Sequence, residues 1–547
     1  MSASSKKKLR NAEKAEQLTE RQLAEQKEAK KLKVFSIVMV AVVALMLAFA
    51  VYTIVSGAIN GSGRLQRSTT AVTVGDHDIS AVEYNCFYVD AVSNFYNQVG
   101  SYASLYGLDV TKALDQQVYD QEAGTTWADY FKTQAENNIK SVYTIADEAE
   151  ANGFALTEED QKAVDSQMSS MAMNALYAGY TNVADYLEAM YGNGANEETV
   201  RAYAEVCYLA TMYQQSIIDS MEYTADEIQA KNDEDPSAYT FYSYNSYYMT
   251  TSKFLEGGTE GEDGTKTYTD AEKAAAVAAA EEAAKTLTAE TITSVEALDA
   301  AIAGLSINAE AEAGSAKSVA YTDQTASYIP SYIHEWVIDD ARQAGDLTYI
   351  PSTSTAEDGT ETVNGYYVVY FTGRNTNEIP LQNVRHILVA FEGGTADSNG
   401  NTTYSDEEKA AAKKEAEELL AQWQAGEATE DSFAALANEK SDDGDGTTGG
   451  LYEDVYPGQM VTNFNDWCFD SARTAGETGI VETEYGYHIM YYVGATDYTY
   501  RHYMIENTLI SEDIQEWHDA LVADVTVTVK NLKYVPTGMI LSPAASY

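Results

Sequence analysis

The feature that most constrains this chain is an internal repeat in its second half. Three segments recur downstream in the same order, at offsets of 136, 131 and 121 residues. They are residues 256–276, 333–346 and 365–373, which match residues 392–412, 464–477 and 486–494. A repeat of this length indicates that one structural unit is present twice.

Each copy has the pattern of an α+β domain. Both contain a hydroxyl residue three positions before a glutamate, Thr269 in the first copy and Ser405 in the second, which predicts a capped helix start. Short runs of branched and aromatic residues at the two ends of each copy predict strands. We therefore expect two tandem α+β domains, at 236–378 and 379–497.

The copies differ in their ionisable groups. The second copy carries His386 near its start and His488 near its end, both on strand-like runs. The first copy has Tyr367 in place of His488, and its opening run FYSYNSYYMTTS has no histidine. A lone histidine on a strand is more often structural than catalytic, but adjacent antiparallel strands would bring these two together as a hydrogen-bonded pair.

The second copy resembles a known family of enzymes. NVRHILV, an amphipathic helix, FAALANEKSDDGDGTTGG, GQMVTNF and ETEYGYHIMYYVG follow one another in residues 383–494. In this combination the segment resembles the parvulin family of peptidyl-prolyl cis/trans isomerases. The resemblance implies that the second copy is an active isomerase and that the first is a degenerate parvulin-like domain.

The resemblance also implies roles for single residues. Carried onto this sequence, the catalytic residues are His386, Asp443 and His488, and the substrate-binding residues are Met460, Phe464, Gln459, Tyr452 and Tyr485. Rotation about an X-Pro bond must break amide resonance, with a barrier of about 18–20 kcal/mol, and an apolar pocket with a polar wall can lower it without a nucleophile. No metal and no cofactor are therefore expected.

An apolar segment near the N-terminus predicts a membrane anchor. Residues 34–55 contain no charge, and at 1.5 Å per residue they span about 33 Å, enough for a bilayer core. The basic segment 1–33 precedes them, so the positive-inside rule predicts a single-pass protein of the cell membrane with a cytoplasmic N-terminus. A cleaved signal peptide is the alternative. The rest of the chain would then be extracytoplasmic, tethered by a linker at 56–73.

Between linker and repeat, residues 74–235 have helical periodicity, and Thr157 followed by Asp160 predicts a capped helix start. We expect a mostly helical, chaperone-like domain that the helix and strand of 498–547 complete. Its helices are rich in Met and Tyr, for which two interpretations remain open. These side chains either form an ordinary core or provide an adaptable groove for unfolded chains.

Charge and cysteine content narrow the range of functions. The formal net charge of −51 argues against nucleic acid as a partner, because phosphate binding requires clustered Lys and Arg. The cysteines Cys86, Cys207 and Cys468 are far apart and have no metal-ligand spacing, so we expect free, buried thiols.

These features lead to one main hypothesis and one alternative. The order of anchor, helical domain and isomerase is similar to that of extracytoplasmic foldases of the PrsA and SurA type. The chain would isomerise X-Pro bonds in unfolded or newly secreted polypeptides. The alternative is a non-catalytic chaperone or surface scaffold that uses both repeats as binding modules.

Overall fold

The computed structural model describes residues 63–541, apart from 263, 289, 313, 357, 398–400 and 445. The predicted span at 34–55 and the basic segment 1–33 lie outside the described residues, so both stay predictions. Among the helices that the structure does describe, none is both long and apolar enough to cross a membrane.

The chain divides into two compact units. Among the described residues, one comprises 63–222 and 510–541, and the other comprises 223–509. The division differs from the expected boundary at 235, because α9 (Ala225–Glu234) belongs to the second unit. The reason is apolar packing: Ile228 of α9 is buried against Tyr239 and Ile505 of the same unit.

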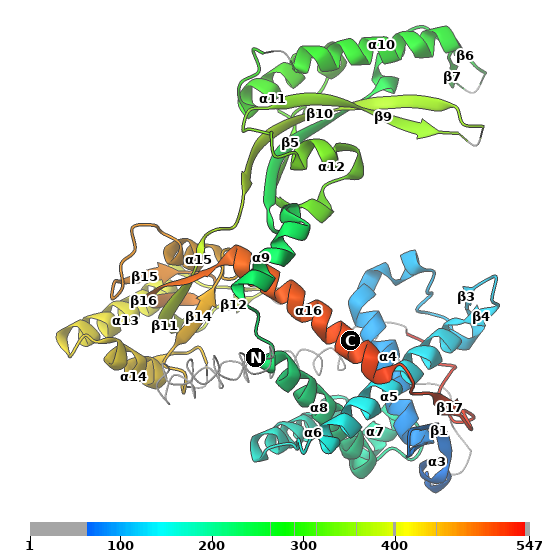
Figure 1. Ribbon diagram of the computed structural model, residues 1–547, viewed down its shortest axis with the longest axis vertical. Helices are drawn as coiled ribbons and strands as arrows, with labels where there is room; N and C mark the ends of the chain where they lie inside the picture. The colour runs from blue at the N-terminus through cyan, green and yellow to red at the C-terminus, as the bar shows by residue number, and fades with distance from the viewer. Residues whose placement is uncertain are drawn as a thin grey trace. The chain divides into compact units, whose positions relative to one another are not determined.

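The first unit is mostly helical (Figure 1). Its helices are α3 (Arg64–Ser68), α4 (Ala81–Val99), α5 (Trp127–Ala151), α6 (Glu158–Tyr177), α7 (Val183–Tyr191), α8 (Glu197–Ser220) and the later part of α16 (Tyr500–Val522). Its three-stranded sheet has the order β17-β1-β2, formed by β1 (Thr70–Val74), β2 (His77–Ser80) and β17 (Val527–Val529). A short hairpin joins β3 (Val118–Asp120) to β4 (Thr125–Thr126).

Helix starts in this unit follow from local sequence. Thr126, Thr157 and Asn196 each form a capping box at the start of α5, α6 and α8. A capping side chain satisfies a backbone N–H that has no partner within the helix. The start predicted from Thr157 is confirmed.

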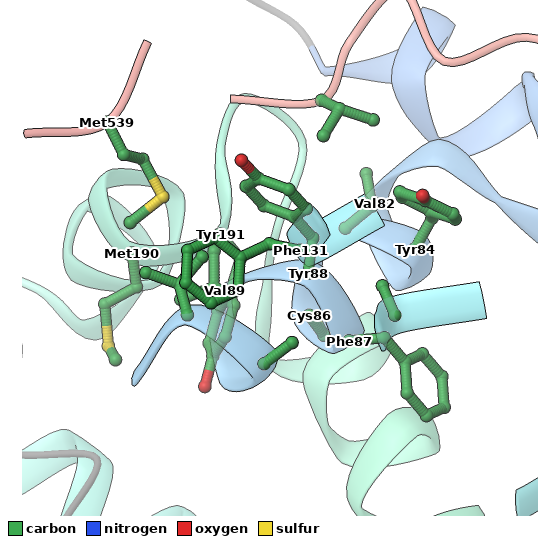
Figure 2. Packing of buried hydrophobic residues seen from close by; sticks show 14 of the residues in the cluster. Val82, Tyr84, Cys86, Phe87, Tyr88, Val89, Phe131, Met190, Tyr191 and Met539 are labelled. Carbon is green, nitrogen blue, oxygen red and sulfur yellow. The ribbon is translucent and has the colours of Figure 1, made fainter. Parts of the chain in front are cut away.

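The core of the first unit surrounds α4. Figure 2 shows Tyr88 of α4 with Phe131 of α5, Tyr191 of α7 and Met539 of the C-terminal segment, all buried. The strand pair β1–β17 adds a second link between the two ends of the chain. Residues after 510 therefore supply both a strand and core side chains to this unit.

The apolar side chains of α6 include both buried and exposed residues. Met168 and Met171 on α6 are 7% exposed and belong to the core. At the end of the same helix, Met173, Leu176 and Tyr177 are 54%, 66% and 84% exposed. One face of α6 is thus ordinary core, and its C-terminal end is an open apolar surface.

The second unit contains two four-stranded antiparallel sheets. The first has the order β8-β5-β10-β9, and the second has the order β14-β11-β16-β15. The domain that contains the first sheet comprises β5 (Phe241–Thr250), α10 (Asp270–Leu287), α11 (Val295–Ala303), β8 (Val319–Thr325), α12 (Ser331–Ile338), β9 (Leu347–Thr355) and β10 (Glu361–Asn375). The domain that contains the second sheet comprises β11 (Pro380–Ala390), α13 (Asp406–Ala425), α14 (Glu430–Lys440), β14 (Leu451–Val455), α15 (Thr462–Cys468), β15 (Thr478–Glu482) and β16 (Gly486–Thr499).

The sequence repeat corresponds to a repeated local structure. Thr269 and Ser405 both form capping boxes, with Glu272 and Glu408, and open α10 and α13 with the same backbone angles. In each case the glutamate also accepts a hydrogen bond from a glycine N–H of the preceding segment, at 3.0 and 2.9 Å. The predicted helix starts are confirmed in both copies.

Strand register shows which residues occupy equivalent positions. In the second sheet Leu388 pairs with His488, and in the first sheet Tyr248 pairs with Tyr367. Two residues earlier on the first strand of each pair, His386 of the second sheet is matched by Ser246 of the first. The first sheet thus has a serine and a tyrosine where the second has two histidines.

Candidate active site

Two histidines on neighbouring strands form the centre of the site. His386 lies on β11 and His488 on β16, and both rings contact Phe464 of α15. They are 2% and 5% exposed, and their Nδ1 atoms are 3.1 Å apart. The structure therefore brings the two histidines together as a buried pair, although they are 102 positions apart in sequence.

A chain of hydrogen bonds runs through this pair. At one end Asp443 Oδ2 lies 3.1 Å from His386 Nε2, and at the other Thr483 Oγ1 lies 2.9 Å from His488 Nε2. Thr483 Oγ1 also accepts from the backbone N–H of Tyr485 at 3.2 Å. All contacts are satisfied when Thr483 donates to His488, His488 to His386 and His386 to Asp443.

The surroundings shift the pKa values of Asp443, His488 and Tyr452. The hydrogen bond from His386 holds the pKa of Asp443 down to about 2, against the opposing effect of partial burial. Burial, reinforced by His386, lowers the pKa of His488 to about 4. Tyr452 donates to Asp443 Oδ2 at 3.0 Å, and burial together with that carboxylate raises the pKa of its phenol. At neutral pH the site therefore holds a carboxylate, a neutral imidazole at His488 and a phenol.

Aromatic side chains form a wall around the histidines. The ring of Phe464 meets both imidazoles edge to face, with centroids 5.4 Å from each, and is 3% exposed. Tyr452 stacks on His386 with centroids 5.0 Å apart. Met460 is partly buried against the apolar cluster that contains Phe464. This wall gives the polar chain an apolar, partly open side.

Two predicted substrate-binding residues lie at the margin of the site. The side-chain oxygen of Gln459 accepts from the backbone N–H of Tyr456 at 3.1 Å, so it closes the turn before Met460. Tyr485 is 57% exposed and contacts the polar chain through its backbone N–H. Thr483, which orients His488, was not predicted, since nothing in ETEYGY distinguishes it from an ordinary turn residue.

A short loop positions Asp443 beside β11. Ser441 Oγ accepts from the N–H groups of Leu388 and Asp443, at 3.1 and 3.2 Å. Asp442 donates its N–H to the Leu388 carbonyl and accepts from the N–H of Ala390, both at 2.9 Å. Asp443 was predicted from the sequence, whereas its two neighbours were not. Three consecutive short polar residues after a helix are the signal that marks such a loop.

A glycine, Gly450, allows the start of the strand β14 to approach His386. The N–H of His386 donates to the carbonyl of Gly450 at 2.9 Å. Gly450 has a φ of 65°, and a Cβ at this position would lie 2.1 Å from the carbonyl oxygen of His386. Only glycine fits here without displacing the histidine strand.

The remaining reactive groups nearby do not form a nucleophilic or metal site. Cys468 is buried in the same apolar cluster as Phe464, and burial raises the pKa of its thiol to about 12. All three cysteines are free, with Cys86 buried and Cys207 partly buried in the first unit. Among the described residues there is no group of three or more His, Cys, Asp or Glu that could hold a metal ion.

Comparison with known proteins identifies the domain. Residues 386–494 match the family model described as Rotamase, PPIC-type PPIASE domain. The match begins at His386 and includes Asp443, Phe464 and His488. The chain therefore contains a parvulin-type peptidyl-prolyl isomerase domain, and this protein is a peptidyl-prolyl isomerase.

The similarity of this chain to solved structures is weaker. The PPIase domain of TbPar42 is 24% identical over 20% of this chain and 98% of its own, with a TM-score of 0.17. PrsA of Bacillus anthracis is 20% identical over 27% of this chain, which spans 58% of that protein's length, at a TM-score of 0.17. A SurA-like chaperone structure from Campylobacter jejuni is 15% identical over 68% and 84%, also at 0.17. No curated protein matches the chain significantly.

Proposed function

We propose that this protein is a membrane-anchored, extracytoplasmic foldase that isomerises X-Pro bonds in newly secreted polypeptides. The observation that carries the proposal is the hydrogen-bonded chain of Asp443, His386 and His488 against the apolar wall of Phe464. The proposed location rests on sequence, namely the apolar segment 34–55 and the basic residues before it. Proline-containing unfolded chains would be its substrates.

The residues would act through differential binding of a twisted amide. Phe464 and Met460 would hold the proline ring, with Tyr452 beside it. In a planar X-Pro amide, resonance places negative charge on the carbonyl oxygen, and this charge declines as the bond twists. A carboxylate at Asp443 near that oxygen would therefore destabilise the planar state relative to the twisted one, and so lower the barrier.

The histidine pair would hold this carboxylate in place. His386 donates to Asp443, and its other ring nitrogen is oriented by His488. His488 is oriented in turn by Thr483. A neutral His488 adds no positive charge that would weaken the field of Asp443, which is why its low pKa suits the task.

The first sheet would be a degenerate, non-catalytic copy. Ser246 and Tyr367 replace the two histidines. Tyr332 stacks on Tyr367 with centroids 4.0 Å apart, so tyrosine rings occupy the place of the polar chain. This copy keeps the strand order of the second sheet and lacks the groups that would act on an amide.

A direct assay of isomerisation tests the catalytic part of the proposal. Full-length protein should accelerate cis/trans exchange in an Ala-Pro tetrapeptide and the proline-limited refolding of a denatured protein. Replacing His386 and Asp443 together by alanine should reduce both rates to near the uncatalysed level. Equal rates in wild type and double variant would refute the proposed site.

An exposed apolar surface supports a second candidate function, chaperone activity that does not depend on the isomerase site. In the first unit, Tyr102, Leu105 and Tyr106 are 66%, 79% and 61% exposed, and exposed apolar patches mark interaction surfaces. This candidate predicts that the His386→Ala/Asp443→Ala variant still suppresses client aggregation. If the variant loses this suppression together with its isomerase activity, the second candidate is wrong.

A further inference from the structure

A groove lined by tyrosines lies in the second unit, separate from the histidine site. Its volume is about 380 Å³, and its main lining residues are Tyr239, Tyr456, Tyr500, Tyr503, Met504 and Asn507. The first belongs to the turn before β5, the second follows β14, and the others lie at the start of α16. We call this feature the tyrosine groove.

The walls of the tyrosine groove are ordered by stacking and by one buried cation. The rings of Tyr456 and Tyr500 are parallel to within 3°, and Tyr456 also stacks on Tyr503, with centroids 5.1 Å apart in both pairs. Arg501, which is 9% exposed, donates to the carbonyl oxygens of Tyr239 and Pro236 at 3.1 and 2.9 Å. The groove is thus preformed, and its aromatic faces need no rearrangement to receive a ligand.

The chemistry of the groove favours an uncharged ligand with apolar rings and carbonyl groups. In the part of the chain that the structure describes, the hydroxyls of Tyr456, Tyr500 and Tyr503 donate to no other group, so they remain available as donors. The amide nitrogen of Asn507 already donates to the Tyr503 carbonyl at 2.8 Å. No charged side chain among the described residues lines the groove. It therefore lacks the cations that a phosphate or carboxylate ligand would need.

Proline-rich polypeptide in the polyproline II conformation has the complementary properties. Each proline offers a compact apolar ring and a carbonyl acceptor, and it has no N–H that would require a partner. Aromatic-lined grooves are the recurrent binding sites for such segments.

We propose that the tyrosine groove binds a proline-rich segment of the polypeptide whose X-Pro bond enters the histidine site. Tyr456 opens a turn that ends at Gln459, immediately before Met460 of the apolar wall. The ends of such a turn lie within about 7 Å of each other. This turn joins the wall of the groove to the apolar wall of the isomerase site, so an extended ligand that follows it would reach both. The inference rests on the proposed function for the source of this ligand.

Binding of a labelled decaproline peptide tests the groove. Fluorescence anisotropy with the full-length protein should show saturable binding, and a Gly-Ser decapeptide should bind at least tenfold more weakly. Tyr500→Ala should weaken decaproline binding at least tenfold. Ala238→Trp, which fills the rim without removing a contact, should do the same, so a folding defect in one variant does not decide the result. Tyr328→Ala, a control at a 79% exposed tyrosine in the first repeat, should bind like wild type.

The outcomes separate this inference from the proposed function. Equal decaproline affinity in wild type, Tyr500→Ala and Ala238→Trp, or no saturable binding at all, overturns the groove as a proline-rich site. Dimers of the wild type that dissociate in both groove variants would also overturn it, since the occupant would then be a second copy of the chain. Turnover of an Ala-Pro tetrapeptide by the wild type reports the proposed function independently, because that ligand is too short to reach the groove.

Discussion

In the proposed mechanism, the carboxylate of Asp443 brings the negative charge to the substrate. It is held by His386 Nε2 at 3.1 Å and by the Tyr452 hydroxyl at 3.0 Å. Both contacts are made to Oδ2, which leaves the other carboxylate oxygen available to face a bound amide. At this scale the proposed mechanism depends on the charge of Asp443 rather than on its shape.

The substitution Asp443→Asn separates these two properties, because it keeps the shape and removes the charge. We expect kcat/KM for an Ala-Pro tetrapeptide to fall by about a hundredfold, or about 2.7 kcal/mol, the typical effect of losing one preorganised electrostatic group. Asp466→Asn, an exposed carboxylate on α15, serves as the control. A wild-type rate in the Asp443→Asn enzyme would show that the charge plays no part.

His488 makes the stability of the second sheet depend on pH. Its pKa is about 4 when folded and 6.5 when unfolded, so only the unfolded state takes up a proton between these values. The stabilisation is fully present above pH 6.5 and is lost as pH falls towards 4. The total loss is on the order of 3 kcal/mol.

Urea unfolding at pH 7 and about pH 4.5, followed by amide exchange in β11 and β16, measures this loss. His488→Asn should remove most of the pH dependence, because no proton is taken up there on unfolding. His334→Asn, on α12 of the first repeat, should retain it. If the wild type and His488→Asn lose stability equally on acidification, the depressed pKa is not the cause.

At the scale of elements, the contact between β14 and the histidine strand depends on Gly450. A Cβ there would meet the His386 carbonyl oxygen at 2.1 Å, whereas at Gly444 nothing lies within 4 Å. Both glycines have positive φ, so both substitutions by alanine carry a conformational cost of about 1–2 kcal/mol. The steric cost differs between them, which makes Gly444→Ala a matched control.

Gly450→Ala should therefore destabilise the second sheet by clearly more than Gly444→Ala and should lower isomerase activity by displacing His386. Thermal unfolding and tetrapeptide turnover of the two variants measure both effects. Similar stability losses in the two variants would mean that the loop yields without moving the strand.

Contacts between residues close in the sequence were easier to predict than contacts between residues far apart in the sequence. The helix starts at Thr269 and Ser405 were predictable, because a capping box joins residues three positions apart. The histidine pair needed only the assumption of adjacent strands. By contrast, Thr483 bonds His488 through a turn whose geometry its residue types do not specify. The tyrosine groove is less predictable still, since it combines side chains from Tyr239 and from the distant α16.

At the scale of the whole molecule, one chain carries two sheets with the same arrangement of equivalent strands but different chemistry. The second matches the isomerase family model, and the first has Ser246 and Tyr367 at the histidine positions. Tyr367 lies between Tyr332 and Tyr248, with centroids 4.0 and 4.5 Å away. This ring stack has no ionisable group that could replace Asp443 at neutral pH.

All isomerase activity should therefore come from the second sheet, even in the full-length protein. In a tetrapeptide assay, His386→Ala should remove most of the activity, because Asp443 loses the donor that holds it. Tyr367→Ala, at the position equivalent to His488, should leave the rate close to that of wild type. A substantial loss in Tyr367→Ala, with circular dichroism showing an intact fold, would mean that the first sheet also contributes to catalysis. The two single substitutions thus assign the activity to one sheet without separating the domains.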